Sequence, residues 1–400
     1  MTHLTAPKSG TALKTAFLSG IALCAVMLAC VCPSSSGTLV RKGVWVTVFS
    51  EKKVLYSREA AGAMVDLCEK NGITDIYLQL YRAGYAYYDS RAADRTKYER
   101  MLKDAGADMV DYITRLAFSN GVKVHAWINV LSLSQNDGAG MLKKYGNDVL
   151  TRDQHGHTSM AVENGKGRRG EFIDEKQLFL EPGDERVSGN AAVIAGEIVK
   201  RYPQLSGIHM DYIRYPYAVP FIPNGEFTRM GLSYGYGKRN VEAFGRETGL
   251  NAYTAFAKKD TALVWDNWKR SRVTEVVRRV AGAARKERPG IEISCAVMPS
   301  IERAYAIAFQ DWPSWLEDGA VDFVVIMNYT IDDGLFYEYA KSASAMRGRG
   351  RVFVGIGAFL MHGKGSTLGA EYESLKRMNA DGVVFFSYDN MPEIKDALLK

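Results

Sequence analysis

The residues best suited to chemistry lie at residues 207–216, where an apolar run ends in polar and aromatic side chains. Alternation along a β-strand places His209 and Asp211 on one face and Met210 and Tyr212 on the other. The face that carries an imidazole and a carboxylate must border a cavity or a polar core. We therefore expect this strand to end in a functional site.

Other predicted strands also end in aromatic, amide or guanidinium groups. These substrate-binding candidates are Tyr81, Arg82, Trp127, Asn129, Arg214, Asn328 and Tyr329. Aromatic faces pack against the C–H faces of sugar rings, and amides and guanidinium groups hydrogen-bond ring hydroxyls. Each aromatic residue alone is more typical of core packing, but their shared position after strands indicates a carbohydrate cleft.

The elements that must position these residues are short β-rich runs that alternate with helical patterns. The expected strands are residues 44–49, 73–80, 122–130, 207–212, 291–297, 321–328, 352–357 and 382–387. The expected helices are residues 57–70, 105–119, 184–201, 239–286, 311–318, 334–345, 366–378 and 392–399. Strict βα alternation predicts the α/β class and a single (β/α)8 TIM barrel, with long insertions after strands 3 and 4.

An open doubly wound sheet is the competing architecture. It commonly carries a Gly-rich phosphate-binding turn after an early strand, whereas residues 44–49 lead into Ser50-Glu51-Lys52. No Ser, Gly or Pro linker marks a second domain, so residues 41–400 are predicted to form one catalytic domain. A TIM barrel carries function at the C-terminal ends of its strands.

Hydrolysis of a glycosidic bond needs two carboxyl groups, one as acid and one as nucleophile or base. Asp211 is the first candidate for nucleophile or base, because Arg214 is near enough in sequence to keep it ionised or to bind substrate. An ion pair that only shapes the loop is the alternative. Asp389 and Asp332 follow strand ends most closely and are the first candidates for the partner. Three further candidates are Glu181, Glu302 and Asp333.

Two other classes of function remain open. His125, His209 and Asp211 could bind a metal ion in a polysaccharide deacetylase, although inward histidines more often orient a catalytic carboxylate. A non-catalytic glycan-binding barrel would keep the aromatic rim and lack the acid pair. Ligands that converge within metal-bond distance would favour the deacetylase, and the absence of a second carboxyl group near Asp211 would favour binding. We expect no cofactor and no bound metal.

Residues 1–40 are predicted to be an export signal or a lipoprotein anchor with a short tether. Lys8 and Lys14 precede the apolar run 16–32, and Cys30 follows Met-Leu-Ala as in a bacterial lipobox. We therefore expect an exported protein that is periplasmic, lipid-anchored at the cell envelope, or secreted. Any membrane contact would be made through this segment.

Composition limits the possible partners. The 400 residues are 47% hydrophobic and 24% charged, with a formal net charge of +6. Because Lys and Arg are dispersed, we expect no nucleic-acid partner, and we predict a monomer that binds a polysaccharide. Cys68 and Cys295 form no metal or redox motif and are predicted to be buried free thiols.

Several motifs together resemble those of one family. They are Arg41 to Thr47, Gln79 with Gly84, Ala86, Tyr88 and Ser90, His125 to Asn129, Leu180 to Gly183, Gly207 to Pro216, Asp311 to Trp312, Trp315 to Asp322, and Phe385 to Tyr388. The chain is similar to the glycoside-hydrolase-like family 10, exported bacterial (β/α)8 proteins. The resemblance spans nearly all of the mature chain, and its most specific motif is residues 207–216.

The resemblance implies hydrolysis of a glycosidic bond in an envelope or extracellular polysaccharide, with the glycan strands of peptidoglycan as the leading substrate. This chain departs from the family pattern at three positions. The family often carries Arg where Tyr81 stands and Asp where Tyr85 stands, and it usually has Asp in place of Glu181. Binding beside the second strand is therefore expected to differ.

Overall fold

The computed structural model describes residues 41–160, 171–173, 177–220, 233–361 and 365–398. The predicted export segment, residues 1–40, lies outside the described residues. Within the described ranges, none of the helices combines the length and the apolar character that a membrane span requires.

Eight parallel strands form the centre of the molecule. They are β1 (Arg41–Val46), β2 (Asp75–Arg82), β4 (Lys123–Asn129), β8 (Gly207–Asp211), β10 (Glu292–Val297), β11 (Phe323–Asn328), β12 (Arg351–Gly357) and β13 (Gly382–Phe386). Their order is β1-β13-β12-β11-β10-β8-β4-β2, and pairing of β1 with β2 closes the sheet. The predicted TIM barrel is confirmed.

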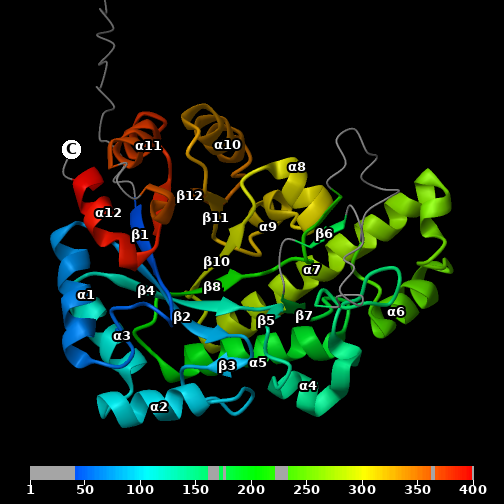
Figure 1. Cartoon of the computed structure of the whole chain (residues 1–400), viewed down its shortest axis with the longest axis horizontal. Helices are drawn as coiled ribbons and strands as arrows, with labels where there is room; N and C mark the ends of the chain where they lie inside the picture. The colour runs from blue at the N-terminus through cyan, green and yellow to red at the C-terminus, as the bar shows by residue number, and fades with distance from the viewer. Residues whose placement is uncertain (1–40, 161–170, 174–176, 221–232, 362–364, 399–400) are drawn as a thin grey trace, which may run out of the picture. The chain divides into compact units, whose positions relative to one another are not determined.

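Helices surround the barrel (Figure 1). They are α1 (Arg58–Lys70), α2 (Thr96–Ala105), α3 (Met109–Ser119), α5 (Glu185–Arg201), α7 (Lys259–Glu287), α9 (Trp312–Glu317), α10 (Asp333–Ala345), α11 (Gly365–Arg377) and α12 (Met391–Leu398). The single helix expected at 105–119 is instead the pair α2 and α3. Gly106, at φ 68°, ends α2, and the Asp108 side chain caps α3 by accepting from the Val110 and Asp111 amides.

The two long insertions carry short elements of their own. The first contains β5 (Ser132–Ser134), α4 (Gly140–Tyr145), η1 (Gly146–Val149), β6 (Glu171–Ile173) and β7 (Leu178–Phe179), and the second contains β9 (Ala218–Pro220), α6 (Lys238–Thr248) and η2 (Ala255–Ala257). β6 pairs with β9, so the insertions contact each other. The remaining short elements are β3 (Tyr85–Ala86), α8 (Ile301–Arg303), η3 (Ala304–Ala308), η4 (Ala358–Met361) and η5 (Tyr388–Asn390).

The interior of the barrel is filled from its N-terminal end upward. Arg41 forms an ion pair with Asp75 and a second one with Glu292 at 2.9 Å, and its guanidinium carbon lies 5.3 Å from the ring centroids of Phe323 and Phe353. Above this charged layer lies an aromatic and aliphatic cluster of Trp45, Tyr77, Trp127, Phe323, Val325, Phe353 and Val384. The lower barrel is therefore solid, and an open site can form only at the C-terminal end.

The two cysteines among the described residues, Cys68 and Cys295, are free and buried, which confirms the expectation. Burial raises the pKa of the Cys68 thiol to about 12, so this thiol is protonated and unreactive near neutral pH.

Candidate active site

A cavity of about 650 Å³ opens at the C-terminal ends of the barrel strands. Its lining combines aromatic, amide, guanidinium and aliphatic groups with one carboxylate. The lining residues are Trp45, Thr47, Phe49, Gln79, Arg82, Trp127, Asn129, Asp211, Tyr212, Arg214, Tyr217, Ala296, Met298, Pro299, Met327, Tyr329 and Phe386. We call this cavity the cleft.

Asp211 is the last residue of β8 and is 9% exposed, so its carboxylate meets solvent only through the cleft. Trp127 on β4 donates its indole N–H to Oδ2 at 3.1 Å, and the Tyr212 backbone N–H donates to Oδ1 at 2.7 Å. These two donors hold the carboxylate in one orientation, as a reacting group requires. The predicted catalytic residue thus lies in the cleft.

The chain changes direction immediately after Asp211. Alternation places Tyr212 on the face opposite Asp211, but Tyr212 adopts a left-handed conformation with φ 55° and also lines the cleft. A bulky residue with positive φ is uncommon and tends to occur at functional sites. The expectation that Tyr212 points away from the site was wrong, because strand geometry ends one residue earlier.

Arg214 also lines the cleft and is 4% exposed. Its guanidinium carbon lies 3.7 Å from the Tyr217 ring centroid and 5.0 Å from that of Tyr212, and its Nη1 donates to the Tyr215 carbonyl at 3.3 Å. Because the rings hold the planar guanidinium, contact with a ligand would cost Arg214 little further side-chain entropy.

The segment that carries these groups is anchored from both sides. On one side Glu181, which is 1% exposed, accepts from the Tyr215 hydroxyl at 2.8 Å, from the Thr151 hydroxyl at 2.8 Å and from the Gly237 amide at 3.1 Å. Burial raises the pKa of Glu181, and these hydrogen bonds partly oppose that shift. Glu181 is therefore a positioning residue outside the cleft, and its candidacy as the second catalytic carboxylate is not supported.

On the other side the buried Gln310 side chain donates to the Ile213 carbonyl at 3.2 Å and accepts from the Met298 amide at 3.0 Å. Since Met298 follows β10 and Ile213 follows β8, the Gln310 side chain joins the end of β10 to the loop after β8. Sequence reasoning did not identify Gln310, because its partners are distant in the chain.

An amide pair forms the wall beside β2 and β4. Gln79 donates to the Asn129 side-chain oxygen at 3.1 Å and accepts from the Val48 amide at 3.2 Å. Next to it, the guanidinium carbon of Arg82 lies 4.4 Å from the Phe49 ring centroid. Asn129 and Arg82 thus lie in the cleft with the predicted Trp127 and Tyr329.

Tyr81 does not line the cleft, contrary to expectation. The β2–β4 register shifts between Gln79 and Tyr81, so Tyr81 pairs with Ile128 and joins the core outside the barrel. A shift of one residue moves a side chain to the opposite face of the sheet. Burial raises the pKa of Tyr81, in agreement with its place in the core.

Asn328 also lies outside the cleft, although it was expected there. Its neighbours Met327 and Tyr329 both face the cleft, so alternation turns Asn328 outward. There its side-chain nitrogen donates to the Phe336 carbonyl at 2.9 Å. Asn328 therefore joins β11 to α10 and is not placed to bind a substrate.

Neither first candidate for the second carboxylate lines the cleft. Asp389 accepts from the Ser50 hydroxyl at 2.5 Å, and the exposed Asp332 caps α10 by accepting from the Leu335 amide at 2.8 Å. Asp333 and Glu302 are exposed and are likewise not among the lining residues. Within the described ranges, Asp211 is the single carboxylate of the cleft.

The three residues of the deacetylase hypothesis lie in successive layers of the barrel. In the β4–β8 register His125 pairs with Gly207, and Asn129 pairs with Asp211. Because Asn129 is four residues beyond His125, Asp211 lies roughly 13 Å farther along the barrel than His125. Such ligands cannot converge on one ion. Burial also lowers the pKa of His209 well below its usual value, and this neutral ring accepts the Trp45 indole N–H at 3.2 Å.

The one described set of side chains with metal-ligand spacing is Asp75, His125 and Glu292, at the closed end of the barrel. The Arg41 guanidinium already hydrogen-bonds both carboxylates. Burial alone would raise the pKa of Glu292, but Arg41 lowers it to about 2. A cationic side chain thus takes the place that a metal ion would need.

The sequence reasoning missed several lining residues, among them Trp45, Tyr217, Met298 and Phe386. Trp45 and Phe386 share the inward face of their strands, so alternation could have identified them. Tyr217 and Met298 lie in loops, where no period indicates the direction of a side chain.

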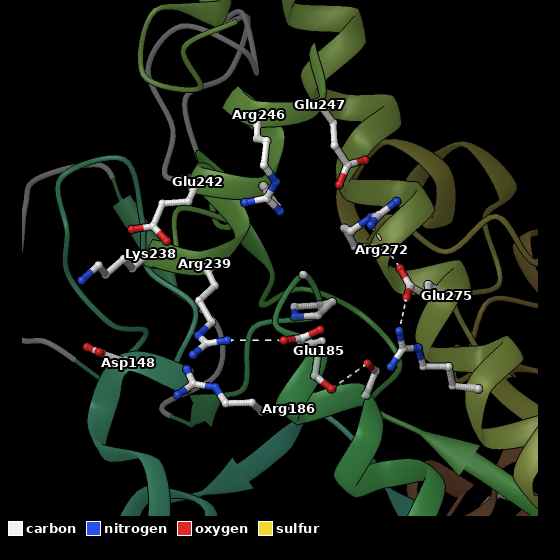
Figure 2. Close-up of a pocket in the computed structure, with 15 residues that line it drawn as sticks. Asp148, Glu185, Arg186, Lys238, Arg239, Glu242, Arg246, Glu247, Arg272 and Glu275 are labelled. Atoms are coloured by element: carbon white, nitrogen blue, oxygen red, sulfur yellow. Dashed lines mark hydrogen bonds and ion pairs between the residues drawn. The ribbon is translucent and has the colours of Figure 1, made fainter. Parts of the chain in front are cut away.

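A second hollow, of about 570 Å³, lies between the start of α5, α6 and α7 (Figure 2). Six cationic and five acidic side chains line it. Several of them pair with each other, as Arg239 does with Glu185 at 3.5 Å and Arg272 with Glu275 at 3.1 Å. The charges nearly balance, so this hollow shows no preference for a ligand of one sign.

The closed (β/α)8 barrel and its aromatic cleft around one oriented carboxylate define a protein of the glycosidase-fold class. The chain belongs to the Glycosyl hydrolase-like 10 family, whose model matches residues 40–348. The resemblance stated from the motifs is thereby confirmed.

Relatives and solved structures agree with this class. The glycosyl hydrolase DigH of Escherichia coli K12 and that of Shigella flexneri are each 22% identical to the chain over 281 residues, which cover 66% of this chain and 56% of the relative. The match thus spans little more than half the length of these relatives. The catalytic domain of a β-amylase from Paenibacillus polymyxa superposes with a TM-score of 0.56 at 12% identity, covering 89% of this chain and 97% of that one. A β-galactosidase from Halorubrum lacusprofundi superposes with a TM-score of 0.56 at 12% identity, covering 87% of this chain and 53% of that one.

Proposed function

We propose that the protein hydrolyses glycosidic bonds in a bacterial envelope or extracellular polysaccharide, with the glycan strands of peptidoglycan as the leading substrate. The observation that carries the proposal is the Asp211 carboxylate, which two N–H donors orient at the base of an aromatic cleft. Family membership and the glycosidase fold support the reaction class, and the identity of the sugar is part of the proposal.

In this mechanism Asp211 acts as nucleophile or base at the anomeric carbon of the bound sugar. As nucleophile it attacks that carbon directly, and as base it removes a proton from the attacking water. In either role the bond from the anomeric carbon to the oxygen of the leaving sugar breaks, and that oxygen takes a proton from solvent water in the open cleft. Trp127 and the Tyr212 amide keep the carboxylate oxygens directed, and the guanidinium of Arg214 hydrogen-bonds sugar hydroxyls. The aromatic rings of Trp45, Trp127 and Tyr329 provide apolar surface for the sugar faces and exclude water.

The decisive variant is Asp211→Asn, which keeps the shape of the side chain and removes its charge. We expect polysaccharide cleavage to be lost, by at least about a thousandfold, while folding and glycan retention persist. Purified glycan strands would be incubated with each protein and the products identified by mass. Asp332→Asn, an exposed helix cap, is the matched control and should cleave like the parent protein.

A glycan-binding barrel without catalysis is the second candidate, because the described lining holds one carboxylate and glycosidases use two. The same assay separates the two functions. Products from the parent protein that disappear with Asp211→Asn establish hydrolysis, whereas retention of glycan without products from either protein establishes binding alone.

We further propose that the protein is exported to the cell envelope. The basic and apolar pattern of residues 1–40 supports this location. The intact mass of the protein purified from its native host would test it. A mature chain that begins at Cys30 and carries acyl mass would establish a lipid anchor.

A further inference from the structure

Phe359 is a large aromatic residue held in an exposed position beside the cleft. It lies in η4, directly after β12, and 47% of it is exposed to solvent. Its ring centroid lies 5.8 Å from that of Tyr329 in an edge-to-face arrangement, and 5.9 Å from that of Phe386. Because Tyr329 and Phe386 both line the cleft, Phe359 continues the same aromatic surface beyond its edge.

The chain makes room for this ring. A Cβ added to Gly357, the last residue of β12, would lie 3.2 Å from the Phe359 ring and 3.2 Å from the Tyr329 Cβ. Such contacts are tighter than ordinary van der Waals contact, so a side chain at position 357 would push the two aromatic residues apart. The glycine thus allows Phe359 to pack closely on the cleft wall while nearly half of its surface stays exposed to solvent.

The strand order places this ring on the far wall from the reacting group. In the order β1-β13-β12-β11-β10-β8-β4-β2, β13 lies opposite β8, and β12 is the next strand after β13. The ring contacts give the order in which a ligand meets these side chains. Trp127, whose indole binds Asp211, has its ring centroid 6.3 Å from that of Phe386, and Phe386 lies 5.9 Å from Phe359, so a ligand that leaves Asp211 along these rings meets Phe386 before Phe359. Aromatic rings arranged in this order could bind successive sugar units of one chain.

We propose that Phe359 forms an outer sugar subsite, and that the protein consequently acts on a polysaccharide chain that extends out of the cleft across β12. The apolar C–H face of a pyranose ring would stack on the exposed face of Phe359. This inference rests on the proposed glycan-binding function and deepens it, because it selects long chains over disaccharides.

The test measures binding without turnover. The Asp211→Asn protein and the Asp211→Asn, Phe359→Ala double variant would be titrated with disaccharides and with octasaccharides prepared from purified peptidoglycan glycan strands. We expect the double variant to bind the octasaccharide about tenfold more weakly and the disaccharide equally well. Phe359→Trp in the same background should retain tight octasaccharide binding.

Phe118→Ala in the same background is the matched control, because Phe118 is 67% exposed near the C-terminal end of α3, remote from the cleft. Equal octasaccharide affinity of the Phe359→Ala and Phe118→Ala proteins would overturn the subsite. So would an equal loss for both sugar lengths, which would indicate a disturbed cleft. If the Asp211→Asn protein binds neither sugar but folds normally, the proposed function itself fails.

Discussion

At the scale of single residues, the site depends on how its carboxylate is held. Asp211 accepts the Trp127 indole N–H at 3.1 Å and the Tyr212 backbone N–H at 2.7 Å. The side-chain donor comes from the neighbouring strand β4, whose register places Asn129 beside Asp211. A hydrogen bond to a charged group is stronger than a neutral one, so the indole contributes to the orientation of the reacting oxygen.

Replacing Trp127 with Phe keeps an aromatic ring and removes this donor. Because a hydrogen bond to a charged group contributes roughly 1.5–3 kcal/mol, we expect kcat for glycan cleavage to fall roughly tenfold to a hundredfold with a smaller change in KM. Steady-state kinetics on glycan strands would measure both constants.

Trp315→Phe is the control for this change, since it removes an indole hydrogen bond to Thr274 of 2.9 Å elsewhere in the molecule. It should lower the stability of the protein slightly and leave kcat unchanged. A Trp127→Phe protein with the parent kcat would contradict a role for the indole.

At the scale of elements, the loop after β8 is the part that most needs support. Its described part contains a left-handed Tyr212, presents Arg214 to the cleft and forms none of the strand pairs of the barrel. Glu181, which precedes α5, and Gln310, which precedes α9, hold it from opposite sides. Two otherwise separate parts of the chain therefore stabilise one functional conformation.

Truncating Glu181 to Ala would leave the Tyr215 and Thr151 hydroxyls and the Gly237 amide without their buried acceptor. We expect the free energy of unfolding to fall by about 2–4 kcal/mol and glycan cleavage to decrease, because the loop that carries Arg214 loses its anchor. Urea denaturation and initial rates would measure the two effects.

Glu185→Ala is the comparison, because Glu185 is a neighbouring carboxylate that is 74% exposed and, among the described residues, forms an ion pair with Arg239 alone. It should change neither stability nor rate appreciably. Parent-like stability of the Glu181→Ala protein would show that the loop does not need this anchor.

At the scale of the whole molecule, buried carboxyl groups link stability to pH in opposite directions. Burial would raise the pKa of Asp75, but His125 and Arg41 lower it well below its usual value, and Arg41 lowers that of Glu292 to about 2. These groups stabilise the fold above their unfolded pKa values near 4, and this stabilisation is lost as the pH falls toward 2. Burial, with a smaller effect from Asp333, instead raises the pKa of Glu371 on α11 to about 8.

Glu371 is 2% exposed, and among the described residues neither of its carboxyl oxygens has a hydrogen-bond partner. Because the folded protein binds this proton more tightly than the unfolded chain, stability should decline by up to roughly 1.4 kcal/mol per pH unit between about pH 5 and 8. Glu371→Gln should flatten this decline without altering the loss of stability in acid. Melting temperatures from pH 3 to 9 would test this, and identical alkaline profiles for both proteins would contradict it.

Much of the architecture follows from patterns that are local in the chain. The alternation of β-rich runs and amphipathic helices predicts the barrel, and the barrel predicts that the end of β8 carries function. Asp211 could be identified because alternation places its side chain on the inward face of the barrel and because it lies at the end of a strand. The split of the expected helix at 105–119 is also a local event, and Gly106 was the available signal.

The composition of the site depends on contacts between distant residues. Tyr81 was misplaced because a bulge in β2 reverses its face, and a bulge depends on pairing with β4 rather than on β2 alone. Asp332 and Asp389 follow strand ends as a catalytic acid would, but one caps a helix and the other binds Ser50. Residue type and spacing do not distinguish these roles.

By itself the sequence determined the βα order, the inward facing of His209 and Asp211 on β8, and the presence of a carboxylate at the end of that strand, because hydrophobic periodicity reports which face of an element is buried. Only the tertiary structure decided which side chains meet in the cleft. Trp127 and Asp211 are 84 positions apart, and Gln310 and Ile213 are 97 apart. The physical reason is that strand register, bulges and loop anchors arise from pairing between segments, and no single segment encodes its partner.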